Sequence, residues 1–249
     1  MSQSVQRAIT LIQRAAQGPL SLTEAASLLA VHKSTALRLL RTLEAARFVR
    51  KTGAGTYVFG GGLIELSELT LGSMDLRQHA GRLLRDLQRR TGHTAHFAQL
   101  MGDEIIYIDK VDSTSHPTVQ LPSRVGHAVS IHASAVGKVI LAHLPRSDRE
   151  RLLSYVTLER HTDTTITDRD SFEVELASVR HRGWAADDGE RDSYVVCVAV
   201  PVRDPRGQVV AAISISSIDV VASLAQLQEA LPLLFATARA VSSELGHLQ

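Results

Sequence analysis

The chain has 249 residues, 44% of them hydrophobic and 21% charged, which is enough apolar material for one or two folded domains and excludes a chain that is disordered throughout. Aromatic residues make up only 4%, which argues against a platform of stacked rings for single-stranded nucleic acid, and no uncharged run approaches the ~18 residues of a membrane span. The single cysteine, Cys197, excludes a disulfide framework and a cysteine-rich zinc site. Because Arg7 and Arg14 interrupt the apolar N-terminal stretch, we expect no secretory signal and a cytoplasmic, globular protein.

The formal net charge of +1 hides an uneven distribution along the chain. Residues 1–60 contain eight Lys or Arg and two acidic residues, a balance of +6, whereas the remaining 189 residues have a balance of −5. A small basic segment joined to a larger acidic one is typical of a nucleic-acid-binding module with a separate partner domain. Scattered surface charge is the alternative that charge alone leaves open.

Residues 1–60 show the pattern of three helices followed by a hairpin. Apolar residues at helical spacing predict helices over 4–16 and about 21–29, and Ser21 with Glu24 forms a capping box at the start of the second. A third helix is predicted from about Ser34 to Ala46. Short apolar segments on both sides of Thr52–Gly55 predict a β-hairpin. This order of elements is that of a winged helix-turn-helix.

Gly60–Gly62 break the pattern and mark the predicted domain boundary. Beyond them the apolar spacing predicts a helical stretch containing Leu63, Ile64, Leu66 and Leu69, whose apolar side chains have no partner within a three-helix module and are candidates for a dimer contact. A further helix is predicted from about 76 to 90.

From Thr91 onward the pattern becomes mixed α/β. Strands are predicted near 94–100, 104–111, 118–121, 194–202 and 208–217, and helices near 133–143, 148–154, 170–182 and 220–245. The turn composition of Asp204–Gly207 makes the last two strands a predicted hairpin. We therefore expect an α+β chain, with a winged helix-turn-helix domain over 1–60, a linker helix over 61–74 and a C-terminal α/β domain over 75–249.

A polar face on the third predicted helix lies opposite its apolar stripe. Hydroxyl groups and backbone amides at its N-terminus suit phosphates, and Arg38 could contact the O6 and N7 atoms of guanine with both guanidinium nitrogens. Taken alone this is also the composition of an ordinary solvated helix face, and the order of the elements is what favours DNA binding. The candidate DNA-binding residues are Lys33, Ser34, Thr35, Arg38, Arg41, Thr42, Arg50 and Lys51.

Four blocks of sequence, in order, resemble the IclR-type (isocitrate lyase regulator) family of bacterial transcription regulators. They are LSLTEAASLLAVHKSTALRLLRTLEAARFV with the wing YVFGGGLIEL, then SIHASAVGKVILAHLP, then TTITD, and last RHRGWAADDGERDSYVVCVAVPV with GQVVAAISISS. The resemblance covers nearly the whole chain. It implies a GAF-like effector-binding domain from about residue 75, double-stranded operator DNA as a partner, and assembly into a homodimer or a dimer of dimers. It leaves open whether the protein is a repressor or an activator.

The resemblance also implies a pocket for a small carboxylate effector, whose oxygens would meet the backbone N–H groups of Ala135 and Val136. These residues open a predicted helix, where unpaired donors and the positive end of the helix dipole favour an anion. Asp187 more plausibly accepts a hydrogen bond from a ligand hydroxyl, or is protonated, because two like charges in a confined site repel. The resemblance implies Leu121, Ala135, Val136, Asp187, Cys197, Ser214 and Ser216 as effector-binding residues. We add Tyr194, which stands where the family usually has glycine and would place a ring and a hydroxyl near the pocket mouth.

A cysteine-dependent hydrolase, with Cys197 as nucleophile and His132 as base, is the alternative from another class of function. Neither residue lies in a nucleophile-specific motif, so we expect no enzyme. The eleven histidines lack HxxxH or HxH spacing, so we expect no metal and no cofactor either. The sequence thus predicts a transcription regulator whose operator affinity is changed by a bound small acid, either hydroxylated or aromatic.

Overall fold

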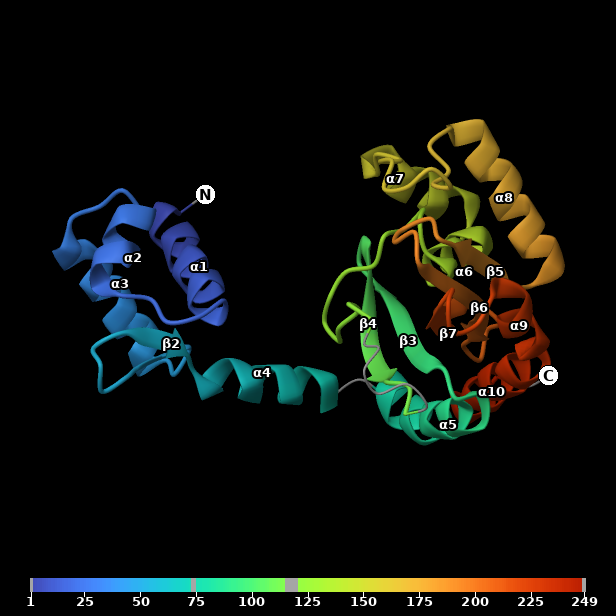
Figure 1. Cartoon of the computed structure of the whole chain (residues 1–249), viewed down its shortest axis with the longest axis horizontal. Helices are drawn as coiled ribbons and strands as arrows, with labels where there is room; N and C mark the ends of the chain where they lie inside the picture. Colours follow the sequence, from blue (N-terminus) through green and yellow to red (C-terminus); the bar gives the residue numbers. More distant parts are fainter. Residues whose placement is uncertain (1, 73–74, 115–120, 248–249) are drawn as a thin grey trace. The chain divides into compact units, whose positions relative to one another are not determined.

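The computed structural model describes residues 2–72, 75–114 and 121–247. The chain divides into two compact units, residues 1–73 and residues 74–249, shown in Figure 1. Each unit has its own hydrophobic core. Over the described residues, no helix is both long enough and apolar enough to cross a membrane.

Three helices and a two-stranded hairpin form the first part of the N-terminal unit. They are α1 (Gln3–Ala16), α2 (Leu22–Leu28), α3 (Lys33–Ala45), β1 (Val49–Lys51) and β2 (Tyr57–Phe59). Leu11, Leu40 and Tyr57 are buried at the centre, where the apolar stripes of α1 and α3 meet the hairpin. The predicted capping box is confirmed, because the hydroxyl of Ser21 accepts from the N–H of Glu24 while the Glu24 carboxylate accepts from the N–H of Ser21. The winged helix-turn-helix is confirmed.

Helix α3 begins one residue before the predicted start. The residue that caps it is His32, whose Nδ1 atom accepts a hydrogen bond from the N–H of Ser34 at 3.3 Å. Ser34 therefore lies inside the first turn, with its hydroxyl 2.9 Å from the same nitrogen.

Gly60–Gly62 do not separate the N-terminal domain from the next helix, α4 (Gly61–Gly72), but allow the two to pack closely. A Cβ atom on Gly60 would lie 2.2 Å from the carbonyl oxygen of Arg47. A Cβ atom on Gly62 would lie 2.8 Å from the carbonyl oxygen of Ala46. The N–H groups of Gly60 and Gly62 donate to the carbonyls of Phe48 and Arg47 at 3.0 and 2.9 Å. Arg47 also forms an ion pair with Glu65 at 2.9 Å. The first turn of α4 is thus fixed to the end of α3, and the structure groups this helix with residues 1–60.

A five-stranded antiparallel sheet forms the centre of the C-terminal unit, with the strand order β4-β3-β7-β6-β5. The strands are β3 (Thr94–Met101), β4 (Glu104–Val111), β5 (Ala185–Asp188), β6 (Val195–Arg203) and β7 (Val209–Ile218). Alternate residues of β6 face opposite sides, as the period of a strand requires. Val198 packs in the core on one face, whereas Cys197 and Ala199 pack in the core on the other.

Helices cover both faces of this sheet (Figure 1). On one face lie α5 (Asp75–Thr91), α9 (Leu224–Glu229) and α10 (Leu231–Glu244). On the other face α6 (Ala135–His143) packs directly, together with α8 (Arg169–Arg182), and α7 (Arg146–Tyr155) lies beside them. The predicted α+β class is therefore confirmed, as an antiparallel sheet between two groups of helices.

Three features of this unit differ from the prediction. Strand β5 was not predicted, because it has four residues and ends in two acids. The helix predicted over 220–245 is two helices that meet at Ala230, where α9 ends and Pro232 suits the first turn of α10. The strand predicted near 118–121 lies largely outside the described residues, and Leu121 itself is not in a strand.

The glycine packing generates a prediction with a matched control inside the same tripeptide. Gly60→Ala and Gly62→Ala should each lower the unfolding free energy by about 1–3 kcal/mol, because the added Cβ overlaps a backbone oxygen. Gly61→Ala should be neutral or slightly stabilising, because its Cβ would meet only the flexible end of Arg47, at 3.8 Å. Urea unfolding of the three full-length variants, with hydrogen exchange over residues 42–60, measures this. Equal effects at all three positions would contradict the close packing.

Candidate nucleic-acid interface and ligand pocket

The polar face predicted on α3 is exposed in the structure. Ala36, Leu40 and Leu43 of this helix are buried, and the residues of the opposite face are exposed except Thr35, which is partly buried. On strand β1, Arg50 and Lys51 are exposed as well. All eight candidate residues thus lie on α3 and the adjoining hairpin, within one unit.

The cationic groups of this face form no ion pair within the described residues. Over the part of the chain that the structure describes, no ion pair involves the side chains of Lys33, Arg38, Arg41, Arg50 or Lys51. The hydroxyl of Thr42 donates to the carbonyl of Arg38 at 3.1 Å, so this threonine is partly occupied within the helix. The guanidinium forks and ammonium groups remain available for phosphates and base edges.

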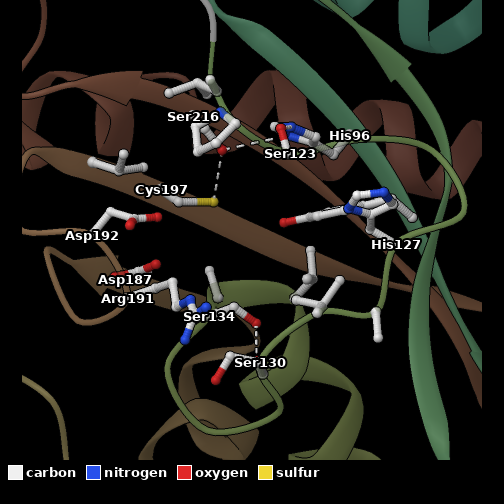
Figure 2. Close-up of a pocket in the computed structure, with 18 residues that line it drawn as sticks. His96, Ser123, His127, Ser130, Ser134, Asp187, Arg191, Asp192, Cys197 and Ser216 are labelled. Carbon is white, nitrogen blue, oxygen red and sulfur yellow. Dashed lines mark hydrogen bonds between the residues drawn. The ribbon is translucent and has the colours of Figure 1, made fainter. Parts of the chain in front are cut away.

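A cavity of about 270 Å³ lies in the C-terminal unit, between the sheet, the N-terminus of α6 and the loop after Leu121 (Figure 2). This volume is near the small end of the range for ligand pockets. The structure brings six of the eight predicted residues to its lining, and these are Leu121, Ala135, Val136, Asp187, Cys197 and Ser216.

The other two predicted residues do not line the cavity. Tyr194 is 50% exposed, so the contact predicted for it at the pocket mouth is not seen in the structure. Ser214 has no exposed surface and lies behind the lining, near the thiol of Cys197. Strand period two does put Ser214 and Ser216 on one face of β7, but only Ser216 reaches the cavity.

The N-terminus of α6 points donors at the cavity. The hydroxyl of Ser134 caps the helix by accepting from the N–H of Gly137 at 3.1 Å, and it donates to the carbonyl of Ser130 at 2.6 Å. Within the described residues, the backbone N–H groups of Ala135 and Val136 have no acceptor. Buried N–H groups without a partner are rare, so these two donors are suited to an anion from solution.

Asp187 faces this helix terminus from strand β5. Its carboxylate accepts a hydrogen bond from the N–H of Glu190 at 2.7 Å. Burial raises the pKa of Asp187 to about 7, and the Glu190 carboxylate adds to this rise, while the backbone N–H groups and the Lys138 ammonium oppose it. Asp187 therefore changes charge near neutral pH, inside the cavity.

The acidic loop that follows β5 is held by a buried ion pair. Lys138, one turn into α6, is only 2% exposed, and its ammonium group contacts the Glu190 carboxylate at 2.5 Å and that of Glu175 at 3.7 Å. Sequence reasoning did not single out Lys138 or Glu190 as parts of the site. Their side chains position the loop and do not line the cavity.

The TTITD block supplies a second attachment for the same loop. The hydroxyls of Thr164 and Thr165 in this block, and of Thr162 just before it, donate to the carbonyls of residues 188–190, at distances from 2.6 to 3.3 Å. Asp168 at the end of the block caps α8 by accepting from the N–H of Ser171. The block thus fixes the wall of the cavity from outside.

The far end of the cavity is built from residues that the sequence did not indicate. The Nε2 atom of His96 lies 2.8 Å from the hydroxyl of Ser123, and the ring centroid of His96 lies 4.8 Å from that of Tyr107. Burial, together with the nearby Lys110 ammonium, lowers the pKa of His96 to about 3, so this imidazole is neutral. Lys110 donates to the carbonyls of Leu121 and Ser123, which holds the loop against β4.

The Cys197 and His132 pair of the alternative hydrolase hypothesis is not assembled. Burial raises the pKa of the Cys197 thiol to about 12, and its sulfur accepts a hydrogen bond from Ser216 at 3.1 Å. The imidazole of His132 instead lies 3.0 Å from the carbonyl of Glu159 and does not line the cavity. A protonated thiol without an adjacent base is not an activated nucleophile. In the described residues, no group of three or more His, Cys, Asp or Glu could hold a metal ion.

Comparisons with known proteins agree with this organisation. The family model for the bacterial transcriptional regulator IclR C-terminal domain matches residues 68–243, and that for the IclR helix-turn-helix domain matches residues 4–53. The HTH-type transcriptional regulator XynR of Escherichia coli is 34% identical over 221 residues, which are 87% of this chain and 86% of XynR. KdgR of the same organism is 33% identical over 229 residues, which are 92% of this chain and 86% of KdgR.

Solved structures agree over nearly the full length. The crystal structure of the Thermotoga maritima IclR matches with a TM-score of 0.85 and 32% identity, covering 98% of both chains. An IclR homologue from Microbacterium hydrocarbonoxydans, in complex with 4-hydroxybenzoate, matches with a TM-score of 0.76 and 25% identity, covering 98% of this chain and 99% of that one. With both domains matched in the same order, the chain belongs to the IclR family of bacterial transcription regulators.

Proposed function

We propose that this regulator binds double-stranded operator DNA through α3 and the hairpin, and that a small carboxylate bound in the C-terminal cavity changes its operator affinity. The single observation that supports a carboxylate ligand is the pair of N–H donors at Ala135 and Val136, which have no acceptor in the described residues and line a cavity of about 270 Å³. The complex of a related regulator with 4-hydroxybenzoate supports an acid of this size. The protein would act in the cytoplasm, because that is where bacterial DNA lies. It would act as a regulator and not as an enzyme.

The DNA contact would follow the pattern of other helix-turn-helix proteins, with α3 in the major groove. The hydroxyl and amide groups of the first turn would contact phosphates, and Arg38, one turn further along the exposed face, would contact a base edge. Arg50 and Lys51 on β1 would contact the flanking backbone. The balance of +6 in residues 1–60 supports a large electrostatic share of the affinity.

The cavity orients the acid. Its carboxylate would lie at the N-terminus of α6, because this is where partial positive charge meets free donors. The neutral His96 at the opposite end offers no such charge. Asp187 beside the carboxylate would be protonated when the ligand is bound, since its pKa is already raised to about 7.

We infer a symmetric assembly, a homodimer or a dimer of dimers, because one recognition helix reads too few base pairs for useful specificity. Apolar residues of the N-terminal unit support this, since Val5, Ile9 and Ile64 are 58%, 49% and 57% exposed. Of the four linker residues proposed for the contact, Leu69 has a side chain outside the described part of the structure. A ligand that favours one arrangement of the subunits would change operator affinity by linkage.

Two substitutions should separate base recognition from phosphate contact. Arg38→Ala should cost roughly 1–3 kcal/mol on cognate DNA and relax specificity, whereas Lys51→Ala should weaken all duplexes about equally and reduce the salt slope by about 1. Fluorescence anisotropy on the gene's own upstream DNA and on a random duplex, over a salt series, measures both. Equal losses on the two duplexes for Arg38→Ala would assign that side chain to phosphate instead.

The titration of Asp187 gives a pH prediction. Below pH 7 the protonated Asp187 side chain can lie beside a ligand carboxylate, whereas above pH 7 two anions share the cavity. The affinity of the wild type for benzoate or 4-hydroxybenzoate should therefore fall as the pH rises above 7, by at most about tenfold per pH unit. Asp187→Asn keeps an oxygen for the Glu190 N–H but cannot ionise, and its affinity should be flat from pH 6 to 8.5. Calorimetry over that range tests this, and identical pH profiles for the two proteins would refute the role of Asp187.

The assembly is tested by mass in solution. Multi-angle light scattering at micromolar concentration should give a multiple of 27.0 kDa. Ile64→Lys should shift the mass toward the monomer if α4 contributes to the contact, and Leu28→Lys, which changes another exposed apolar side chain, serves as control. A wild-type mass of one chain would contradict the symmetric assembly.

A further inference from the structure

Tyr107 lies in the cavity wall with its ring packed against His96 at a centroid distance of 4.8 Å. Burial raises the pKa of its hydroxyl, so the hydroxyl is protonated and can donate a hydrogen bond. In the described residues no hydrogen-bond partner of this hydroxyl is present. Tyr107 is only partly buried, so its hydroxyl is accessible to a ligand in the cavity that it lines.

The neighbouring polar groups already have partners. His96 lies within hydrogen-bond distance of Ser123 through Nε2, at 2.8 Å, and of Ser216 through Nδ1, at 3.4 Å. Ser216 in turn donates to the Cys197 sulfur. Figure 2 shows these groups gathered at one end of the cavity, with Ser130 and Ser134 at the other end. In the described residues the side chains of Tyr107 and His127 both line the cavity without a hydrogen-bond partner, and Tyr107 is the one that packs against His96.

The backbone holds Tyr107 firmly in place. Its N–H donates to the carbonyl of His127 at 3.2 Å, and its carbonyl accepts from the N–H of Gly126 at 2.7 Å. Two more backbone contacts, the bridge between Ile106 and Ala128 and the bond from Val129 to Ile105, join the same loop to β4. A fixed backbone, together with the packing of the ring against His96, gives the hydroxyl a defined position, which is what discrimination between ligands requires.

We propose that Tyr107 selects acids that carry a second hydrogen-bonding oxygen, a hydroxyl or a carbonyl, at the end away from the carboxylate. This inference rests on the proposed function, because it takes the carboxylate to lie at the N-terminus of α6. An acid without that oxygen would leave the Tyr107 hydroxyl unpaired and would bind more weakly. The role that the sequence indicated for the exposed Tyr194 thus passes to Tyr107.

The test is calorimetry on full-length protein with matched pairs of acids, benzoate against 4-hydroxybenzoate and butyrate against 3-hydroxybutyrate. The wild type should prefer a hydroxylated acid by about tenfold, the size of one net hydrogen bond. Tyr107→Phe should lose this preference and keep its affinity for the plain acid, which also shows that the variant is folded. Tyr194→Phe, the matched control, should keep the wild-type preference.

Each other outcome is decisive. If the wild type binds these acids without preference, or if Tyr107→Phe keeps the preference, the inference about Tyr107 is wrong while the proposed function stands. If the preference is lost in Asp187→Asn and kept in Tyr107→Phe, the hydroxyl contact belongs to Asp187. If the wild type binds none of the four acids, the carboxylate pocket fails, and the inference fails with it.

Discussion

The buried ion pair of Lys138 with Glu190 is the interaction on which the cavity depends. It joins the first turns of α6 to the loop after β5, so the helix N-terminus and Asp187 are held on facing walls. Removing one partner of such a pair costs about 3–5 kcal/mol, because the other charge stays buried and uncompensated. The threonine hydroxyls of residues 162–165 fix the same loop from the solvent side. Two sequence blocks that are far apart in the chain thus form one wall.

Burial shifts the pKa of three groups that line the cavity, in different directions. The pKa of His96 falls to about 3 and that of Cys197 rises to about 12, so both are neutral at physiological pH. Asp187, with a pKa raised to about 7, is the group whose charge changes there. The N-terminus of α6 therefore supplies partial positive charge, whereas His96 and Tyr107 are neutral polar groups.

The sequence predicted the elements better than it predicted the cavity lining. Helical and strand periodicity placed most elements within two residues, because each buries one face and shows it in the chain. It missed β5, which is short and acidic, and it took Gly60–Gly62 as a break, because glycine marks close packing and chain breaks alike. The resemblance led to Asp187 and Cys197 but not to His96 or Tyr107, whose place depends on which strands become neighbours. Tyr194 was selected because it replaces the glycine usual in the family, but it directly precedes β6 and is exposed.

Ligand binding and DNA binding must influence each other equally if the account is right. The most direct test uses an acid identified by a thermal-shift screen and the upstream DNA of the regulator's own gene. Operator affinity is measured with and without saturating acid, and acid affinity with and without saturating DNA. The account predicts that the acid changes operator affinity by the same factor as DNA changes acid affinity, and that this factor differs from 1. Replacing Ala135 by proline, which removes one of the two N–H donors, should abolish the effect. A bound acid that leaves operator affinity unchanged would contradict it.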